Sequence, residues 1–204
     1  MTDTALFPAD PEDTRVEILK ATYHALCEHG YADLTIDRIG QHFPKSKSLL
    51  YHHYDGKDDL ILDFLAYLLG TFEAGLGLDE EADAEGRLQQ LLDRVLTPDS
   101  HGDADALQRA IVELRAQGAS DAEYRQHFTD HDRFFRERIA AIVADGIESG
   151  TFREDADPEA VAAMIHTLVG GSMVSRATSG DHDIAAVRAE LDAYIEQRLL
   201  ADGR

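Results

Sequence analysis

The segment Thr35–Leu60 reads TIDRIGQHFPKSKSLLYHHYDGKDDL, and its residue pattern is the strongest indication of how this chain folds. Apolar residues recur in it at helical spacing, and Pro44 interrupts the pattern. The spacing predicts a short helix over 36–42, a tight turn, and a second short helix over 46–53. A longer helix is expected to begin near Lys57, where a run of apolar residues starts. Two short helices joined by a turn therefore precede a long one.

Lysine is scarce in this chain and is concentrated in the same stretch. Three of the four lysines are Lys45, Lys47 and Lys57, although the net charge of the chain is −21. Residues 1–57 carry 9 acidic and 6 basic side chains, whereas residues 58–204 carry 31 and 13. A negatively charged protein repels nucleic acid as a whole, so a group of cations on one small surface indicates double-stranded DNA, met through its phosphates.

The rest of the composition indicates a folded protein of the cytoplasm. Hydrophobic residues make up 44% of the 204, enough for a packed core. A surface rich in Asp and Glu and nearly free of Lys is typical of halophilic proteins, which must stay hydrated in concentrated salt. The sequence has no run of 18 apolar residues and no basic-then-apolar leader, so neither a membrane nor export is expected. The single cysteine, Cys27, is expected to be a buried thiol.

Helical periodicity continues to the end of the chain, and no segment alternates as a β-strand would. Breaks rich in Gly, Asp, Ser or Pro separate about nine helices. We therefore expect an all-α fold, with a helix-turn-helix domain over 12–56 and a larger helical domain over 57–201 for effector binding and dimerisation. The helices expected outside the short pair are 11–29, about 57–75, 83–96, 104–117, 121–149, 158–178 and 184–201.

Motifs in and around the opening stretch resemble those of the TetR family of transcriptional regulators. The resemblance covers about residues 14–62 and implies a DNA-binding domain at the start of an all-helical dimer. It departs from the family in the turn, where Phe43-Pro44-Lys45 replaces the usual Ala-Gly-Val, and at Ser48. The matching motifs are Glu28-His29-Gly30-Tyr31, Leu34-Thr35-Ile36, Ile39-Gly40, Ser46-Lys47, Leu50-Tyr51-His52-His53-Tyr54 and Lys57-Asp58-Asp59-Leu60.

In a helix-turn-helix, the second helix enters the major groove with its N-terminal residues toward the base edges. Lysine and serine can hydrogen-bond to those edges, and leucine can touch a thymine methyl. Side-chain donors near helix N-termini suit phosphate oxygens, and the family resemblance implies that role for Tyr51, His52 and Lys57. We expect Lys45, Ser46, Lys47, Ser48 and Leu49 to form the leading turn of the second helix, which lies against the DNA, and Thr35, Tyr51, His52 and Lys57 to contact the backbone. Because the turn departs from the family, Lys45 and Ser48 bear on base preference.

One short recognition helix reads too few base pairs to be specific, so a homodimer on a palindromic operator is expected. Two apolar stripes near the C-terminus suit a four-helix interface between two copies, as the resemblance also implies. The same stripes would also suit packing within one chain, and the sequence leaves both interpretations open. The stripe residues are Val161, Ile165 and Leu168 in the first helix, and Val187, Leu191, Tyr194 and Ile195 in the second.

Apolar and aromatic side chains of the middle helices would either line a pocket for a small-molecule effector or fill an ordinary core. The candidates are Phe72, Leu96, Ile111, Leu114, Phe128, His131 and Met164. His127 and His131 have the spacing of two metal ligands on one helix face, but no third ligand matches, so no metal or other cofactor is expected.

No catalytic motif stands out, so the sequence predicts a regulator and not an enzyme. The leading hypothesis is an effector-responsive repressor that binds its operator as a homodimer. The alternatives are a DNA-binding regulator of the same fold without an effector, and a helical bundle that binds metal at His127 and His131.

Overall fold

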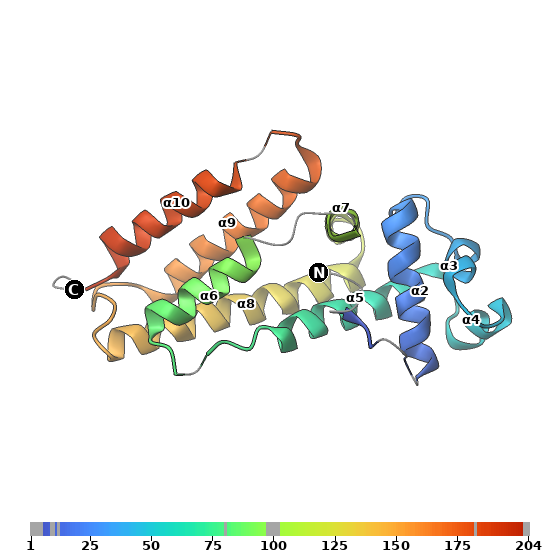
Figure 1. Ribbon diagram of the computed structural model, residues 1–204, viewed down its shortest axis with the longest axis horizontal. Helices are drawn as coiled ribbons and strands as arrows, with labels where there is room; N and C mark the ends of the chain where they lie inside the picture. Colours follow the sequence, from blue (N-terminus) through green and yellow to red (C-terminus); the bar gives the residue numbers. More distant parts are fainter. Residues whose placement is uncertain are drawn as a thin grey trace. The chain divides into compact units, whose positions relative to one another are not determined.

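The computed structural model describes residues 6–8, 11, 13–79, 81–96, 103–181 and 183–201. Over these ranges it contains nine α-helices and no β-strand (Figure 1), which confirms the predicted all-α fold. None of the helices in these ranges could span a lipid bilayer. The helices are α2 (Thr14–His29), α3 (Ile36–His42), α4 (Lys47–His53), α5 (Lys57–Gly75), α6 (Ala84–Leu96), α7 (Asp103–Gln117), α8 (Ala122–Glu148), α9 (Pro158–Thr178) and α10 (Ile184–Tyr194), followed by the π-helix η1 (Ile195–Leu199).

Local capping explains where several helices begin and end. The α2 helix starts after Asp13, whose carboxylate accepts a hydrogen bond from the Arg15 N–H at 2.8 Å. The predicted start at Pro11 was therefore too early. The helix ends at Gly30, whose φ of 71° lies in the left-handed region that glycine adopts without strain. Asp157 caps α9 in the same way as Asp13 caps α2, with Pro158 as the first helical residue.

The end of the chain differs from the single helix predicted over 184–201. The α10 helix changes to a π-helix after Tyr194, and helical structure ends at Leu199. Leu200 instead forms an isolated β-bridge with Phe152. Backbone hydrogen bonds from Arg153 N to Leu199 O (2.9 Å) and from Ala201 N to Thr151 O (3.1 Å) hold the chain end there. Tertiary pairing therefore overrides the helical periodicity of the last turn.

The chain divides into two compact units, each described here by itself. The first unit comprises Met1–Gly75 and Asp99–Phe128, and the second comprises Leu76–Pro98 and Thr129–Arg204. In the first unit, α2 packs against α3, α5 and α7. In the second, α9 packs against α6 and α10. This division follows compactness alone, and the functional boundary between 12–56 and 57–201 stays a prediction.

The first unit has a continuous apolar core that fixes the short helices. Leu50 of α4 is 1% exposed and Ile39 of α3 is fully buried. Cys27 is half-buried, and its thiol contacts the Asp103 carbonyl oxygen at 3.5 Å. Other fully buried side chains around the short helices are Ile18, Leu19, Tyr23, Leu26, Leu60, Ile61, Phe64 and Leu65. Their burial orients α3 and α4 on a rigid support.

Candidate nucleic-acid interface

The leading turn of α4 is presented to solvent, while the opposite face of the helix is buried. Phe43 and Leu50 anchor the helix pair in the core, and Pro44 lies exposed in the turn between α3 and α4. Tyr51 is 62% exposed although it is a large aromatic residue. Of the predicted DNA contacts, Leu49 and Lys57 are half-buried, and the exposed ones are Thr35, Lys45, Ser46, Lys47, Ser48, Tyr51 and His52.

The side chain of Lys47 extends across α3 toward an acidic residue. Its Nζ donates to Asp37 Oδ1 at 2.8 Å. Gly40 permits this path, because a Cβ at that position would lie 2.8 Å from Lys47 Cγ. Both charged groups are about half exposed or more, so the ion pair contributes little stability. It does place an acidic competitor beside the ammonium group that a phosphate would bind.

Lys45 is held toward the start of α2. Its Nζ donates to Thr14 Oγ1 at 3.1 Å and forms an ion pair with Glu17. Glu17 is the more buried partner, with 17% of its side chain exposed. A role of Lys45 at base edges would require the ammonium group to leave this carboxylate.

Lys57 has a structural partner that the sequence did not reveal. Its Nζ donates to the Tyr31 carbonyl oxygen at 3.0 Å and lies 4.2 Å from the centroid of the Tyr31 ring. The contact joins the first residue of α5 to the segment after α2. The predicted phosphate contact of Lys57 remains a prediction, because the N-terminal end of α5 is also where an anion is favoured.

Hydroxyl groups organise the two helix starts. Thr35 Oγ1 caps α3 by accepting a hydrogen bond from the Arg38 N–H at 3.2 Å. Its own hydroxyl hydrogen can still be donated to a phosphate oxygen. Ser46 makes no capping hydrogen bond and instead lies 3.0 Å, oxygen to oxygen, from Ser48. The backbone N–H groups at the start of α4 are therefore not capped by the Ser46 side chain.

Hydrogen bonds among Arg15, Tyr54 and Asp63 hold the end of α4 against α2 and α5. Asp63 accepts hydrogen bonds from Arg15 Nε at 2.8 Å and from the Tyr54 hydroxyl at 2.6 Å. Burial raises the pKa of the Asp63 carboxyl, but the hydrogen bonds from Arg15 and Tyr54 outweigh it, and the net pKa is lowered. Burial, reinforced by the bond to Asp63, raises the pKa of Tyr54. Sequence reasoning missed this network, because Arg15 lies 48 residues before Asp63 and meets it only when α2 packs against α5.

Asp63→Asn is expected to lower the free energy of unfolding by about 1–2 kcal/mol at neutral pH, because a charge-assisted pair is lost. Since the pKa of Asp63 is lowered in the folded state, its contribution is present above the unfolded value of about pH 4 and disappears as the pH falls through the folded value. Denaturant unfolding of both proteins from pH 7 to pH 3 measures this.

Tyr54→Phe is the matched control for that experiment, because it removes one hydrogen bond but leaves the Arg15–Asp63 pair. It should cost less than Asp63→Asn. A stability difference between wild type and Asp63→Asn that stays constant down to pH 3 would contradict the network.

The predicted dimer residues fall into two groups in the structure. Buried inside their own chain, at 5% exposure or less, are Val161, Ile165, Leu191 and Ile195. Val187 and Tyr194 are half-buried, and Leu168 is 37% exposed. Side chains of their own chain cover these four residues. The interface itself stays a prediction.

The predicted pocket residues are divided between the two units. Phe72, Ile111, Leu114 and Phe128 belong to the first, and Leu96, His131 and Met164 to the second. Met164 lines a cavity of about 540 Å³ within the second unit, whose wall also includes Arg153, Asp155, Tyr194 and Arg198. Its wall mixes these polar groups with apolar side chains, among them Ala156, Ala160 and Val161. The effector pocket stays a prediction.

Comparison with known proteins agrees with this architecture. Residues 18–64 match the family described as bacterial regulatory proteins, tetR family, and residues 84–200 match the BetI-type transcriptional repressor C-terminal family. The transcriptional repressor AcnR of Corynebacterium efficiens is 25% identical over 170 residues, covering 83% of this chain and 85% of that protein.

Solved structures of transcriptional regulators show the same fold. A TetR transcription regulator from Haloarcula marismortui is 34% identical with a TM-score of 0.83, over 93% of this chain and all of that one. A transcriptional regulator from Saccharomonospora viridis, solved with choline, shares the fold at 22% identity and a TM-score of 0.75, over 93% of this chain and 99% of that one. The chain therefore belongs to the TetR family of DNA-binding transcriptional regulators.

Proposed function

We propose that the protein represses transcription as a homodimer, with the two α4 helices in successive major grooves of a palindromic operator. The observation that carries the proposal is the exposure of the leading turn of α4 on a buried anchor. Ser46, Lys47 and Ser48 are exposed, whereas Leu50, one turn further along, is 1% exposed. A recognition helix needs this combination, because its N-terminal side chains must reach bases while its position stays rigid.

Two helices of the second unit offer a surface for the twofold partner. Gly170 and Gly171 lie in open space, since a Cβ on either would meet no described atom within 4 Å. Small residues let two helices approach closely, and exposed apolar residues can be buried between them. Twofold symmetry would then pair α9 and α10 with their copies in a four-helix arrangement. The exposed residues are Ala163, Leu168, Gly171 and Val174 of α9, and Ala185, Ala186 and Ala189 of α10.

Release by a small organic effector completes the proposal. Support comes from a transcriptional regulator of the same fold, that of Saccharomonospora viridis, which is solved in complex with choline. An effector acts by binding more tightly to the protein conformation that does not fit the operator. Genome-wide recovery of bound DNA fragments would identify the operator, and the neighbouring genes would indicate which compounds to test as releasing ligands.

Lys47→Ala should weaken binding to every operator variant by roughly tenfold and reduce the log–log salt slope by about 1, because it removes one lysine–phosphate contact. Asp37→Asn should do the reverse and strengthen binding, since Asp37 competes with phosphate for the Lys47 ammonium group at 2.8 Å. Fluorescence anisotropy with labelled operator at several KCl concentrations measures both effects.

Glu137→Gln, at an exposed residue of α8, is the control for the change in net charge and should leave the affinity nearly unchanged.

Lys45→Ala and Ser48→Ala should instead change which operator variants are preferred. With so few cations in each half-site, the total salt slope should be shallow. A steep loss of wild-type affinity between moderate and high salt, or equal affinity of Lys47→Ala and wild type, would refute this account of the interface.

A further inference from the structure

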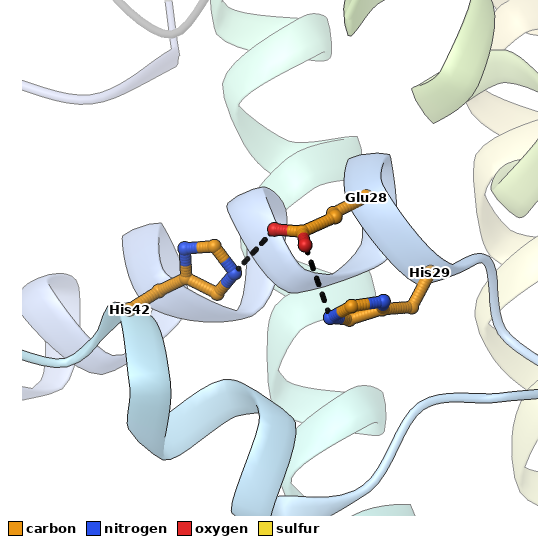
Figure 2. Close-up of side chains that lie close together, drawn as sticks. All are labelled: Glu28, His29 and His42. Atoms are coloured by element: carbon orange, nitrogen blue, oxygen red, sulfur yellow. Dashed lines mark ion pairs between the residues drawn. The ribbon is translucent and has the colours of Figure 1, made fainter.

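Three side chains that can ligate a metal ion converge where α2 and α3 end (Figure 2). Glu28 and His29 are the last two residues of α2, and His42 is the last residue of α3. His42 Nε2 lies 3.1 Å from Glu28 Oε2, and His29 Nε2 lies 3.7 Å from Glu28 Oε1. Within the described part of the chain, this is the one group of three His, Cys, Asp or Glu residues whose donor atoms all lie within 4.8 Å of one another.

The separations between these donors fit a coordination shell. Ligands bound about 2.0–2.1 Å from zinc in a tetrahedron lie about 3.3 Å from one another. The closest distances from the Glu28 carboxylate, 3.1 Å from Oε2 to His42 Nε2 and 3.7 Å from Oε1 to His29 Nε2, lie on either side of that value. Two imidazoles and one carboxylate form the protein ligand set of many zinc and non-haem iron sites, whereas Mg²⁺ and Ca²⁺ prefer oxygen alone.

The surroundings of the cluster favour a cation. His29 Nε2 is shielded from solvent and has no hydrogen-bond partner among the residues that the structure describes. A shielded polar atom without a partner costs free energy, and a metal ion on the nitrogen lone pair would offset that cost. The C-terminal end of α2 also carries the partial negative charge of the helix dipole. His24, one turn before Glu28, adds a third imidazole nearby, with its ring centroid 6.0 Å from that of His42.

We propose that Glu28, His29 and His42 bind a divalent transition-metal ion of the zinc class. The ion would join the C-terminal ends of α2 and α3, and α3 is the first helix of the helix-turn-helix. None of the predicted DNA contacts supplies a ligand, so metal binding is separate from operator recognition and does not depend on it. This site also differs from the His127 and His131 pair that the sequence suggested.

The test uses the full chain without a histidine tag, in concentrated KCl with excess Mg²⁺ to saturate the acidic surface. Titration with Co²⁺ should show one equivalent per chain and the visible absorption of a low-coordinate Co²⁺ site, which Zn²⁺ displaces. The thermal unfolding midpoint should rise with either ion. His29→Gln and His42→Gln should each weaken binding at least about tenfold. His127→Gln is the matched control and should leave the affinity unchanged.

Glu28→Gln gives a further variant that keeps the fold, because 60% of this side chain is exposed; it should also weaken Co²⁺ binding. Circular dichroism checks that each variant is folded before titration. The proposal is overturned if wild type shows no saturable Co²⁺ binding, if His29→Gln/His42→Gln binds as tightly as wild type, or if His127→Gln is the variant that loses the ion.

Discussion

Val174→Glu should convert the protein from a dimer to a monomer and weaken operator binding at least about a hundredfold. Val174 is 40% exposed on α9, near the open positions of Gly170 and Gly171. In a twofold interface a residue close to the axis meets its own copy, so two new carboxylates would be desolvated against each other. A cost of about 3 kcal/mol corresponds to about a hundredfold in the dissociation constant. A monomer would then read only one half-site. Sedimentation in concentrated salt and operator anisotropy measure the two effects.

Ala141→Glu is the matched control, because it adds the same charge at an exposed position of α8 in the same unit. It should leave both assembly and operator affinity unchanged. Leu191→Glu gives a second comparison: Leu191 is 2% exposed, so a charge there should unfold the second unit instead of producing a folded monomer. A Val174→Glu protein that remains a dimer at concentrations where wild type binds DNA would exclude this face as the interface.

Gly146→Ala should lower the free energy of unfolding by roughly 2–3 kcal/mol, although alanine is the better helix former by up to about 1 kcal/mol. Gly146 lies in the last turn of α8, and a Cβ there would be 2.0 Å from Phe152 Cδ2. Phe152 is 1% exposed, and its N–H donates to the Gly146 carbonyl oxygen at 2.9 Å. Because this hydrogen bond ties Phe152 to the end of α8, moving the ring away from the helix would strain the turn. Urea unfolding followed by circular dichroism measures the loss.

Gly70→Ala supplies the control for the helix-propensity term. Gly70 is inside α5, where a Cβ meets no described atom within 4 Å, so this change should stabilise the protein by about 0.5–1 kcal/mol. The double variant Gly146→Ala/Phe152→Leu should lose less than the sum of its single changes, because leucine relieves the clash. Additive losses would show that the close approach is not the cause.

Local signals in the sequence account for most of the element boundaries. The α3 helix was predicted over 36–42 and α9 over 158–178, and both have these bounds in the structure. Thr35 and Asp157 accept hydrogen bonds from backbone N–H groups two or three residues ahead, so these caps operate within one turn of chain. The last helix was harder to predict, because its end is set by pairing with Phe152, far away in sequence.

The all-α class and the helix-turn-helix could be predicted from the sequence, because each depends on spacing within a few turns of chain. Which face of an amphipathic helix is covered, and which charged groups meet, depends on how the helices pack. Leu191 and Val174 both read as apolar residues, yet one is buried and the other is exposed. Asp37 beside Lys47, and His42 beside Glu28, become neighbours only when the helices pack. Periodicity specifies that a helix has an apolar face, but the partner helices determine how much of it leaves water.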